Sequence, residues 1–407
     1  MTDRKTDLSR RGFLASSLGC LASAGLMAAS NLGCKSDPPA DTPLVQGDPI
    51  MRKLGRTDIV TPIVGQGGGG ATDPGFVYKC YKQGMRLFDT DARYRGGRHE
   101  EMLGLAFARM NVRHDVILMT KVHTPEQRAG LSPEESKALL YRTVEGCLRR
   151  LQTDYIDILL VHDVSSPRPI KDPSIMEAMA TVKQQGKTRY IGTATHANMA
   201  TAINATVEAG IYDVVLTAIN FTMADDTRLL SAIQNAADTG VGIVAMKTQA
   251  GGYAFPNPDT MEDYSTAVIN SAALKWVCQN ENITASVPGI SNFDHLRANL
   301  AVGVDPEYTD EERRFLADND IKLSMEFCRQ CRYCVATCPN NVEIPALMRT
   351  HMYTRQYADF DLARQTLDLI ESDRGLSACA ACSTCRAECA NSVNIARKIA
   401  ELIAVYA

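Results

Sequence analysis

The sequence has little excess charge of either sign and no long apolar run. Its 407 residues include 43 Lys and Arg against 47 Asp and Glu, so no basic field is available to bind nucleic acid. No segment reaches about 18 consecutive strongly apolar residues, the length that a membrane-spanning helix needs. Hydrophobic residues make up 45% and charged residues 22%, which excludes a mostly disordered chain. We expect two or three globular domains, at roughly 150 residues each.

Residues 1–34 have the composition of an export signal. Residues 9–14 are Ser-Arg-Arg-Gly-Phe-Leu, and a mildly apolar stretch follows them. This pattern resembles a twin-arginine (Tat) signal peptide, which implies passage through the Tat translocon to the periplasm or cell envelope. A disordered basic N-terminus beside a short buried helix is the alternative. A lipid anchor at Cys34 stays open, because the preceding glycine fits a lipoprotein cleavage site whereas Asn31 does not.

From about Arg52, short β-branched runs alternate with segments of helical periodicity, such as 134–151 and 264–278. Apolar strands separated by helices indicate a parallel sheet that is covered on both faces. The expected strands are 60–64, 85–88, 116–119, 156–161, 189–191, 214–219, 241–245 and 284–287. Eight such units in about 250 residues match an α/β fold of the (β/α)8 TIM-barrel type, with a doubly wound open sheet as the alternative. The expected divisions are a signal at 1–34, a polar linker at 35–48, the barrel at 49–320 and a small α-helical, ferredoxin-like domain at 321–407.

A glycine run after the first strand favours the open sheet. Residues 65–70 satisfy G-x-G-x-x-G, and Asp89 lies about 20 residues further on, as in a dinucleotide-binding turn. In such a turn the helix follows at once, so that its N-terminus meets the pyrophosphate. Here residues 71–74 intervene, and we expect the helix to start after Pro74. We therefore prefer the barrel, in which the glycines still permit close approach of a pyrophosphate.

Three consecutive strand ends carry side chains suited to acid–base chemistry. Functional groups of a barrel lie where its strands end, and these strands end at Asp89, Lys121 and His162, with Tyr94 five residues after Asp89. A lysine beside a tyrosine lowers the pKa of the phenol, and a carboxylate can hold that lysine in place. The tyrosine could then be a general acid, and a neutral histidine could orient a carbonyl oxygen. Alternatively, each residue is an ordinary polar group at a strand end.

Residues 51–300 resemble the aldo-keto reductase superfamily. The matching segments are 52–57, 88–90 with Tyr94, Lys121, 157–162, 191–192, 287–289 and Asn299. The resemblance implies a catalytic tetrad of Asp89, Tyr94, Lys121 and His162. It implies hydride transfer from NAD(P)H to a small aldehyde or ketone, with Tyr94 protonating the carbonyl oxygen. The implied cofactor contacts are Gly67, Asp89, Thr195, Gly289 and Asn299.

The cofactor clamp departs from the family pattern. Members commonly hold the nicotinamide carboxamide with Ser-Asn after the fifth strand and Gln on the sixth. Ala194, Thr195 and Leu216 stand at those positions, and only Thr195 can form a hydrogen bond. No basic pair matches the site for an adenosine 2′-phosphate, because His295 stands near one position and Arg297 is shifted. A barrel without turnover, in an electron-transfer or scaffold protein, therefore stays open.

The remaining histidines and three isolated cysteines carry less information. We expect His123 and His196, which follow strand ends, to line the mouth of the barrel. We expect surface or helix positions for His99, His114 and His351. We expect plain packing roles for Cys80, Cys147 and Cys278, which lie on apolar helix faces.

Cysteine is abundant: there are 13, and eight lie in the last 80 residues. The spacing C-x2-C-x2-C-x3-C occurs twice, and its first copy is followed by Pro339 as in bacterial ferredoxins. By resemblance to dicluster ferredoxin modules, one [4Fe-4S] cluster has the ligands Cys328, Cys331, Cys334 and Cys389. The other has the ligands Cys379, Cys382, Cys385 and Cys338. The helical pattern at 346–353 and 362–369 indicates the α-helical form of this module, and a redox partner protein is implied. Zinc and disulfides are the alternatives.

Overall fold

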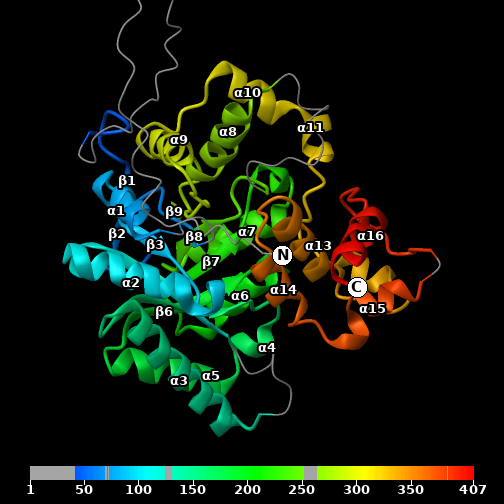
Figure 1. Cartoon of the computed structure of the whole chain (residues 1–407), viewed down its shortest axis with the longest axis horizontal. Coiled ribbons are helices and arrows are strands. Elements are labelled where there is room, and N and C mark those ends of the chain that lie inside the picture. The colour runs from blue at the N-terminus through cyan, green and yellow to red at the C-terminus, as the bar shows by residue number, and fades with distance from the viewer. Residues whose placement is uncertain (1–41, 69–70, 72, 124–130, 252–263, 383) are drawn as a thin grey trace, which may run out of the picture. The chain divides into compact units, whose positions relative to one another are not determined.

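The computed structural model describes residues 42–68, 71, 73–123, 131–251, 264–382 and 384–407 (Figure 1). The expected signal at residues 1–34, including Cys34, lies outside these ranges. Within them, every helix is too short or too polar to cross a membrane.

Seven parallel strands form one sheet, and their order in space follows their order in the chain. They are β3 (Leu87–Asp89), β4 (Ile117–His123), β5 (Ile156–His162), β6 (Thr188–Thr195), β7 (Val214–Ala218), β8 (Gly242–Met246) and β9 (Ala285–Ser286). A doubly wound sheet reverses its strand order part of the way across. The unbroken order therefore excludes the open-sheet alternative.

Residues 64–67 take the remaining place, between the two edges of this sheet. Val64 and Gly67 form parallel bridges to Ser286 and Gly289, while Gln66 bridges Phe88 on the other side. The strand predicted at 60–64 is wrong in part. Val60–Pro62 (β2) instead pairs antiparallel with Met51–Lys53 (β1), since a short apolar run does not by itself distinguish a hairpin strand from a barrel strand.

Helices follow the strands, as the alternating pattern predicts (Figure 1). They are α1 (Pro74–Lys82), α2 (Arg98–Met110), α3 (Pro133–Leu151), α4 (Pro167–Ile170), α5 (Pro173–Gln184), α6 (Met199–Ala209), α7 (Thr227–Asp238), α8 (Thr266–Cys278), α9 (Phe293–Val304), α10 (Asp310–Ala317) and α11 (Asn319–Ser324). The two helices predicted at 134–151 and 264–278 correspond to α3 and α8. Helix α1 begins at Pro74, where Asp73 caps it by accepting from Phe76 N. The three isolated cysteines are buried in the core, as predicted.

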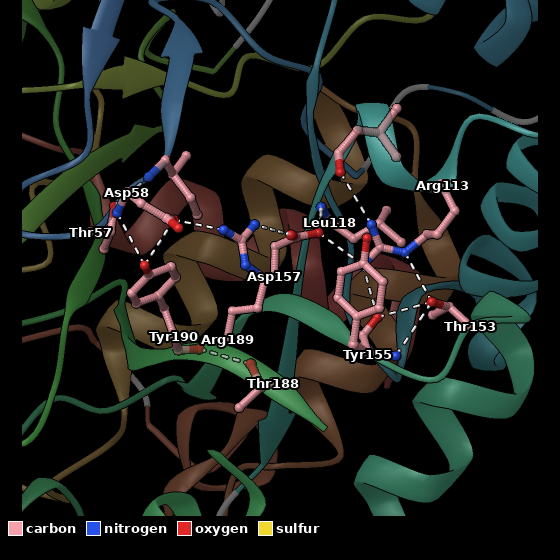
Figure 2. Close-up of polar contacts among 12 residues, drawn as sticks. Thr57, Asp58, Arg113, Leu118, Thr153, Tyr155, Asp157, Thr188, Arg189 and Tyr190 are labelled. Carbon is pink, nitrogen blue, oxygen red and sulfur yellow. Dashed lines mark hydrogen bonds and ion pairs between the residues drawn. The ribbon is translucent and has the colours of Figure 1, made fainter. Parts of the chain in front are cut away.

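An ion-pair network centred on the buried Asp157 connects the starts of the strands (Figure 2). Asp157, near the start of β5, lies 2.9 Å from Arg113 and 2.8 Å from Arg189. Its carboxylate also accepts from the backbone N of Leu118 at 3.0 Å. Arg189 continues to Asp58 at 2.6 Å. Since each of these charges has an opposite partner, the network stabilises this end of the sheet.

The C-terminal segment is helical, as predicted. Its helices are α12 (Tyr333–Thr337), α13 (Ile344–Arg355), α14 (Phe360–Leu367), α15 (Leu376–Ala380) and α16 (Ile395–Tyr406). Helix α13 packs against α14 and α16 and is buried along most of its length. It also reaches the carboxyl ends of the barrel strands, where Arg349 pairs with Asp163 at 2.6 Å and Tyr353 accepts from Lys247 at 3.0 Å. The C-terminal helices therefore cover the mouth of the barrel.

Candidate active site

Three of the predicted residues meet at the carboxyl ends of β3 and β4. Lys121 Nζ lies 2.6 Å from Asp89 Oδ1 and 2.7 Å from the carbonyl oxygen of Thr90. The Lys121 side chain is fully buried. Its Nζ lies 5.1 Å from the centroid of the Tyr94 ring. The carboxylate thus holds the lysine next to the tyrosine, as the sequence predicts.

The pKa of Tyr94 moves opposite to the prediction. Burial raises this pKa well above its ordinary value, and the carboxylates of Asp89 and Asp91 raise it further. The expected net lowering of the Tyr94 pKa beside Lys121 is therefore not found. Asp89 already balances the charge of Lys121 at 2.6 Å, and Asp91 adds a second negative charge. The phenol of Tyr94 therefore keeps its proton at neutral pH.

His162 is neutral, as predicted, but both of its ring nitrogens contact other side chains. Burial lowers its pKa to about 4. Its Nδ1 lies 2.7 Å from Asp91 and 3.2 Å from His123, and its Nε2 lies 3.0 Å from His196. His123 and His196 thus reach the mouth of the barrel, as predicted. A histidine that orients a carbonyl oxygen needs a free N–H, and neither nitrogen of His162 is free in this arrangement.

Of the other predicted histidine positions, His99 and His351 are buried. His99 lies on α2 and its Nδ1 is 2.8 Å from Thr90 Oγ1. His351 lies on α13 and its Nε2 is 2.7 Å from Glu401. Both are therefore helix residues with defined partners, whereas His114 is exposed.

A cleft of about 240 Å³ opens beside Tyr94 and Asp89. Gly67, Gly68 and Gly289 form part of its wall, and Tyr353 and other residues of the C-terminal helices form another part. Gly68 is required here, because a Cβ at this position would lie 2.5 Å from the Tyr94 ring. A smaller cavity of about 40 Å³ lies next to the histidines.

The predicted cofactor contacts divide into two groups. Gly67, Asp89 and Gly289 line the cleft. Thr195 does not, because its hydroxyl donates to the carbonyl of Ala197 at 3.0 Å. Asn299 lies behind the wall, where its Oδ1 accepts from Gln249, a cleft residue, at 3.2 Å. The Nδ2 atom of Asn299 is buried and has no hydrogen-bond partner among the described residues.

Lys247 and two residues of α13 were not predicted to belong to this site. Burial, and then the charge of Arg349, lowers the pKa of Lys247 to about 7. Its ammonium group lies 4.7 Å from the ring centroid of Tyr353. Lys247 directly follows β8, so its position at a strand end was an available signal. Nothing in the sequence indicated that Arg349 and Tyr353, from the C-terminal segment, would contact the barrel.

The eight C-terminal cysteines form two groups of four. Burial raises the pKa of the Cys328 thiol to about 12, and the group that interacts with it consists of Cys331, Cys334 and Cys389. Burial raises the pKa of the Cys379 thiol to about 11, and the group that interacts with it consists of Cys338, Cys382 and Cys385. These are the two sets that the ferredoxin spacing implies. Every described cysteine is a free thiol, so the disulfide alternative gains no support.

Comparisons with known proteins match two parts of the chain to two different families. Residues 75–268 match the Aldo/keto reductase family, and residues 327–394 match the 4Fe-4S dicluster domain. L-galactose dehydrogenase from Arabidopsis thaliana is 27% identical over 300 residues, which cover 66% of this chain and 92% of that protein. The aldo-keto reductase YhdN from Bacillus subtilis is 37% identical over 110 residues, 27% of this chain and 33% of that protein.

Solved structures share the barrel. An aldo-keto reductase from Klebsiella pneumoniae in complex with NADPH has a TM-score of 0.52 and 23% identity, covering 66% of this chain and 94% of that one. An aldo-keto reductase from Bacillus halodurans, in its holo form, has the same TM-score and identity and covers 66% of this chain and 96% of that one. At this identity the likeness establishes the fold of the N-terminal part.

Proposed function

We propose that the chain is an oxidoreductase, with an aldo/keto reductase domain followed by a 4Fe-4S dicluster domain, and that it interconverts a small carbonyl compound and its alcohol with NAD(P)(H). The observation that carries the proposal is the buried Lys121–Asp89 pair beside Tyr94 at the edge of the cleft. Two adjacent strands, β3 and β4, bring an acid, its supporting cation and a carboxylate together beside one cleft, an arrangement suited to proton transfer.

The cleft fits a nicotinamide dinucleotide in part. A Cβ on Gly289 would meet nothing within 4 Å, so the wall is open at that point, and Asn299 Nδ2 is a buried donor in need of an acceptor. We propose that Gly67, Gly289 and Asn299 hold the dinucleotide, which supplies a hydride when bound. The NADPH of the Klebsiella pneumoniae relative belongs to the same cofactor class. At the expected carboxamide clamp, however, Ala194 and Leu216 are fully buried apolar side chains.

The chain's own residues supply the proton. The pKa of Tyr94 is raised by burial, so the phenol carries the proton that a carbonyl oxygen needs as its negative charge develops. Lys121, held by Asp89 and the carbonyl of Thr90, is fixed in place and offsets the charge that Tyr94 gains when it releases that proton. Tyr353 and Tyr357, from the C-terminal segment, exclude water from one side of the cleft.

We propose that the two cysteine groups each hold one [4Fe-4S] cluster, which passes single electrons when it is redox-active. The donor sets fit, because four thiols gather twice with the ferredoxin spacing. Anaerobically purified protein should contain about eight iron and eight sulfide per chain. Replacing Cys331 should remove about half of the iron. Stoichiometric zinc without sulfide would contradict this assignment.

We also propose that the chain is exported through the Tat translocon. Residues 9–14, with their arginine pair, support this proposal. Replacing Arg10 and Arg11 by Lys should leave the precursor in the cytoplasm, as fractionation with an antibody would measure. Incorporation of a labelled lipid precursor, abolished in Cys34→Ala, tests a lipid anchor separately. Unchanged delivery of the double-lysine variant would refute the Tat proposal.

The absent carboxamide clamp favours a second candidate, an electron-transfer or scaffold protein whose barrel does not turn over. One experiment separates the two candidates. Protein from the exported fraction is denatured and the released small molecules are identified, while intact protein is titrated with NAD(H) and NADP(H) and its thermal unfolding is followed. A released nicotinamide, or a rise in the unfolding temperature, supports the reductase. No nucleotide and no thermal response would support the second candidate.

A further inference from the structure

Asp91, His123 and His162 bring three ligand atoms together at the mouth of the barrel, all within 4.8 Å of one another. Asp91 follows β3, and the two histidines are the last residues of β4 and β5. Parallel pairing places His123 directly beside His162 in the sheet. Asp91 and His162 are buried, and the side chain of His123 is 10% exposed. The backbone register therefore fixes this cluster.

Hydrogen bonds alone cannot make all three contacts among Asp91, His123 and His162 favourable. Asp91 Oδ2 lies 2.7 Å from His162 Nδ1 and 3.2 Å from His123 Nε2, while the two ring nitrogens lie 3.2 Å apart. If both nitrogens carry protons, two donors face each other across 3.2 Å. If only one carries a proton, the lone pair of the other faces the carboxylate. Each choice leaves one of the three contacts unfavourable.

A metal ion in the centre would make all three contacts favourable. Two neutral imidazoles and one carboxylate are the donors of the facial triad that binds divalent transition metals. Ligands at right angles, each about 2.1 Å from the ion, lie about 3.0 Å apart. The observed separations of 2.7 to 3.2 Å bracket that value. The 40 Å³ cavity beside these residues leaves room for further ligands.

The surroundings support such an ion. His162 Nε2 lies 3.0 Å from His196 Nε2, so a proton on His162 Nε2 can be donated to His196 while Nδ1 faces the centre. Fixing the second nitrogen in this way orients a ligating histidine. Two cations lie close by, but each already has a carboxylate partner: Lys121 pairs with Asp89, and Arg349 pairs with Asp163. Asp91 Oδ1 accepts from the backbone N of Arg93 at 2.7 Å, so Oδ2 is the oxygen available to the ion.

We propose that Asp91, His123 and His162 bind one divalent first-row transition-metal ion, separate from the iron–sulfur clusters. This proposal does not depend on whether the barrel transfers a hydride. If the barrel also reduces carbonyl compounds, the ion would lie near Tyr94, because Tyr94 and the three proposed ligands line the same small cavity. His162 then acts as a ligand and not as the free N–H donor that the family resemblance implies.

The test uses the anaerobically purified full chain with both clusters in place. The protein is treated with a mild chelator, equilibrated with Zn²⁺ alone and freed of excess ion, and zinc, iron and sulfide are quantified in the same sample. Wild type should retain one zinc per chain with its iron unchanged. Asp91→Asn and His123→Ala should each lose at least nine-tenths of that zinc. His114→Ala, at an exposed histidine of the same barrel, should retain it.

X-ray absorption at the zinc K-edge, measured on zinc-loaded wild type, identifies the ligands. This measurement does not depend on whether the variants fold. A shell of nitrogen and oxygen that includes two imidazoles supports the site. A sulfur shell would show that zinc had entered the cysteine groups, and equal zinc in wild type and Asp91→Asn would show that it binds elsewhere. Either result overturns the proposal. Since no substrate or nucleotide is present, loss of reductase activity does not affect the outcome.

Discussion

Strand β5 has a polar cluster at each end, and the two clusters differ in how their charges are paired. At its start, Asp157 lies between Arg113 and Arg189, and each charge meets an opposite one (Figure 2). At its end, His162 and His123 share the single carboxylate of Asp91. The first cluster has the pairing expected of a stabilising network. In the second cluster, at least one contact among Asp91, His123 and His162 is unfavourable without a further ligand, and unfavourable contacts of this kind are typical of functional sites.

Tyr94→Phe, at the carboxyl ends of the strands, should produce the largest effect, a loss of activity. It removes the proton donor and leaves the ring, so kcat for carbonyl reduction should fall by about 10²- to 10⁴-fold. Unfolding in urea should change little. Tyr81→Phe is the matched control, because its hydroxyl donates to Asp115 at the surface, at 2.7 Å. A reductase activity that survives Tyr94→Phe would place the acid elsewhere.

Asp157→Asn should act on stability alone. Breaking a buried ion pair costs about 3–5 kcal/mol. Because the Arg189 side chain is 39% exposed and partly screened, we expect a loss of about 2–3 kcal/mol in the free energy of unfolding. Asp294→Asn, which breaks a pair between exposed side chains, should cost less than about 1 kcal/mol. Urea titrations measure the stability of both variants. If Asp157→Asn lowered kcat without lowering stability, the two ends of β5 would not differ in the way described above.

The last effect concerns Lys247 and depends on pH. Its folded-state pKa of about 7 lies below the value of about 10.4 for an unfolded lysine. Between those values only the unfolded chain binds the proton, so wild type should lose stability relative to Lys247→Met as the pH falls from about 10 to 7. The slope should reach about 1.4 kcal/mol per pH unit and vanish below pH 7. Urea titrations across this range, with the exposed Lys53→Met as control, would show a flat difference if the Lys247 ammonium is well paired.

The strand ends made much of this site predictable. Asp89 ends β3 and Lys121 lies two residues before the end of the adjacent strand β4, and a barrel brings adjacent strand ends together, so their contact follows from sequence order. The contact between His123 and His162 depends on the register of β4 against β5, for which the sequence has no marker. The upward shift of the Tyr94 pKa depends on burial and on Asp91, neither of which spacing reveals. The two cysteine sets were predictable because short local spacing defines them.

Helix α13 connects the C-terminal cysteine segment with the mouth of the barrel. It follows the first cysteine run and ends with Tyr353 against Lys247 and Arg349 against Asp163. Five of the eight C-terminal cysteines, Cys328, Cys334, Cys338, Cys379 and Cys389, lie in one apolar cluster with residues of α13 and α16. If the two cysteine groups hold the proposed clusters, a chain that loses them to oxygen or iron starvation should also lose this wall of the cleft. We expect iron supply to set how much carbonyl substrate such a protein can process.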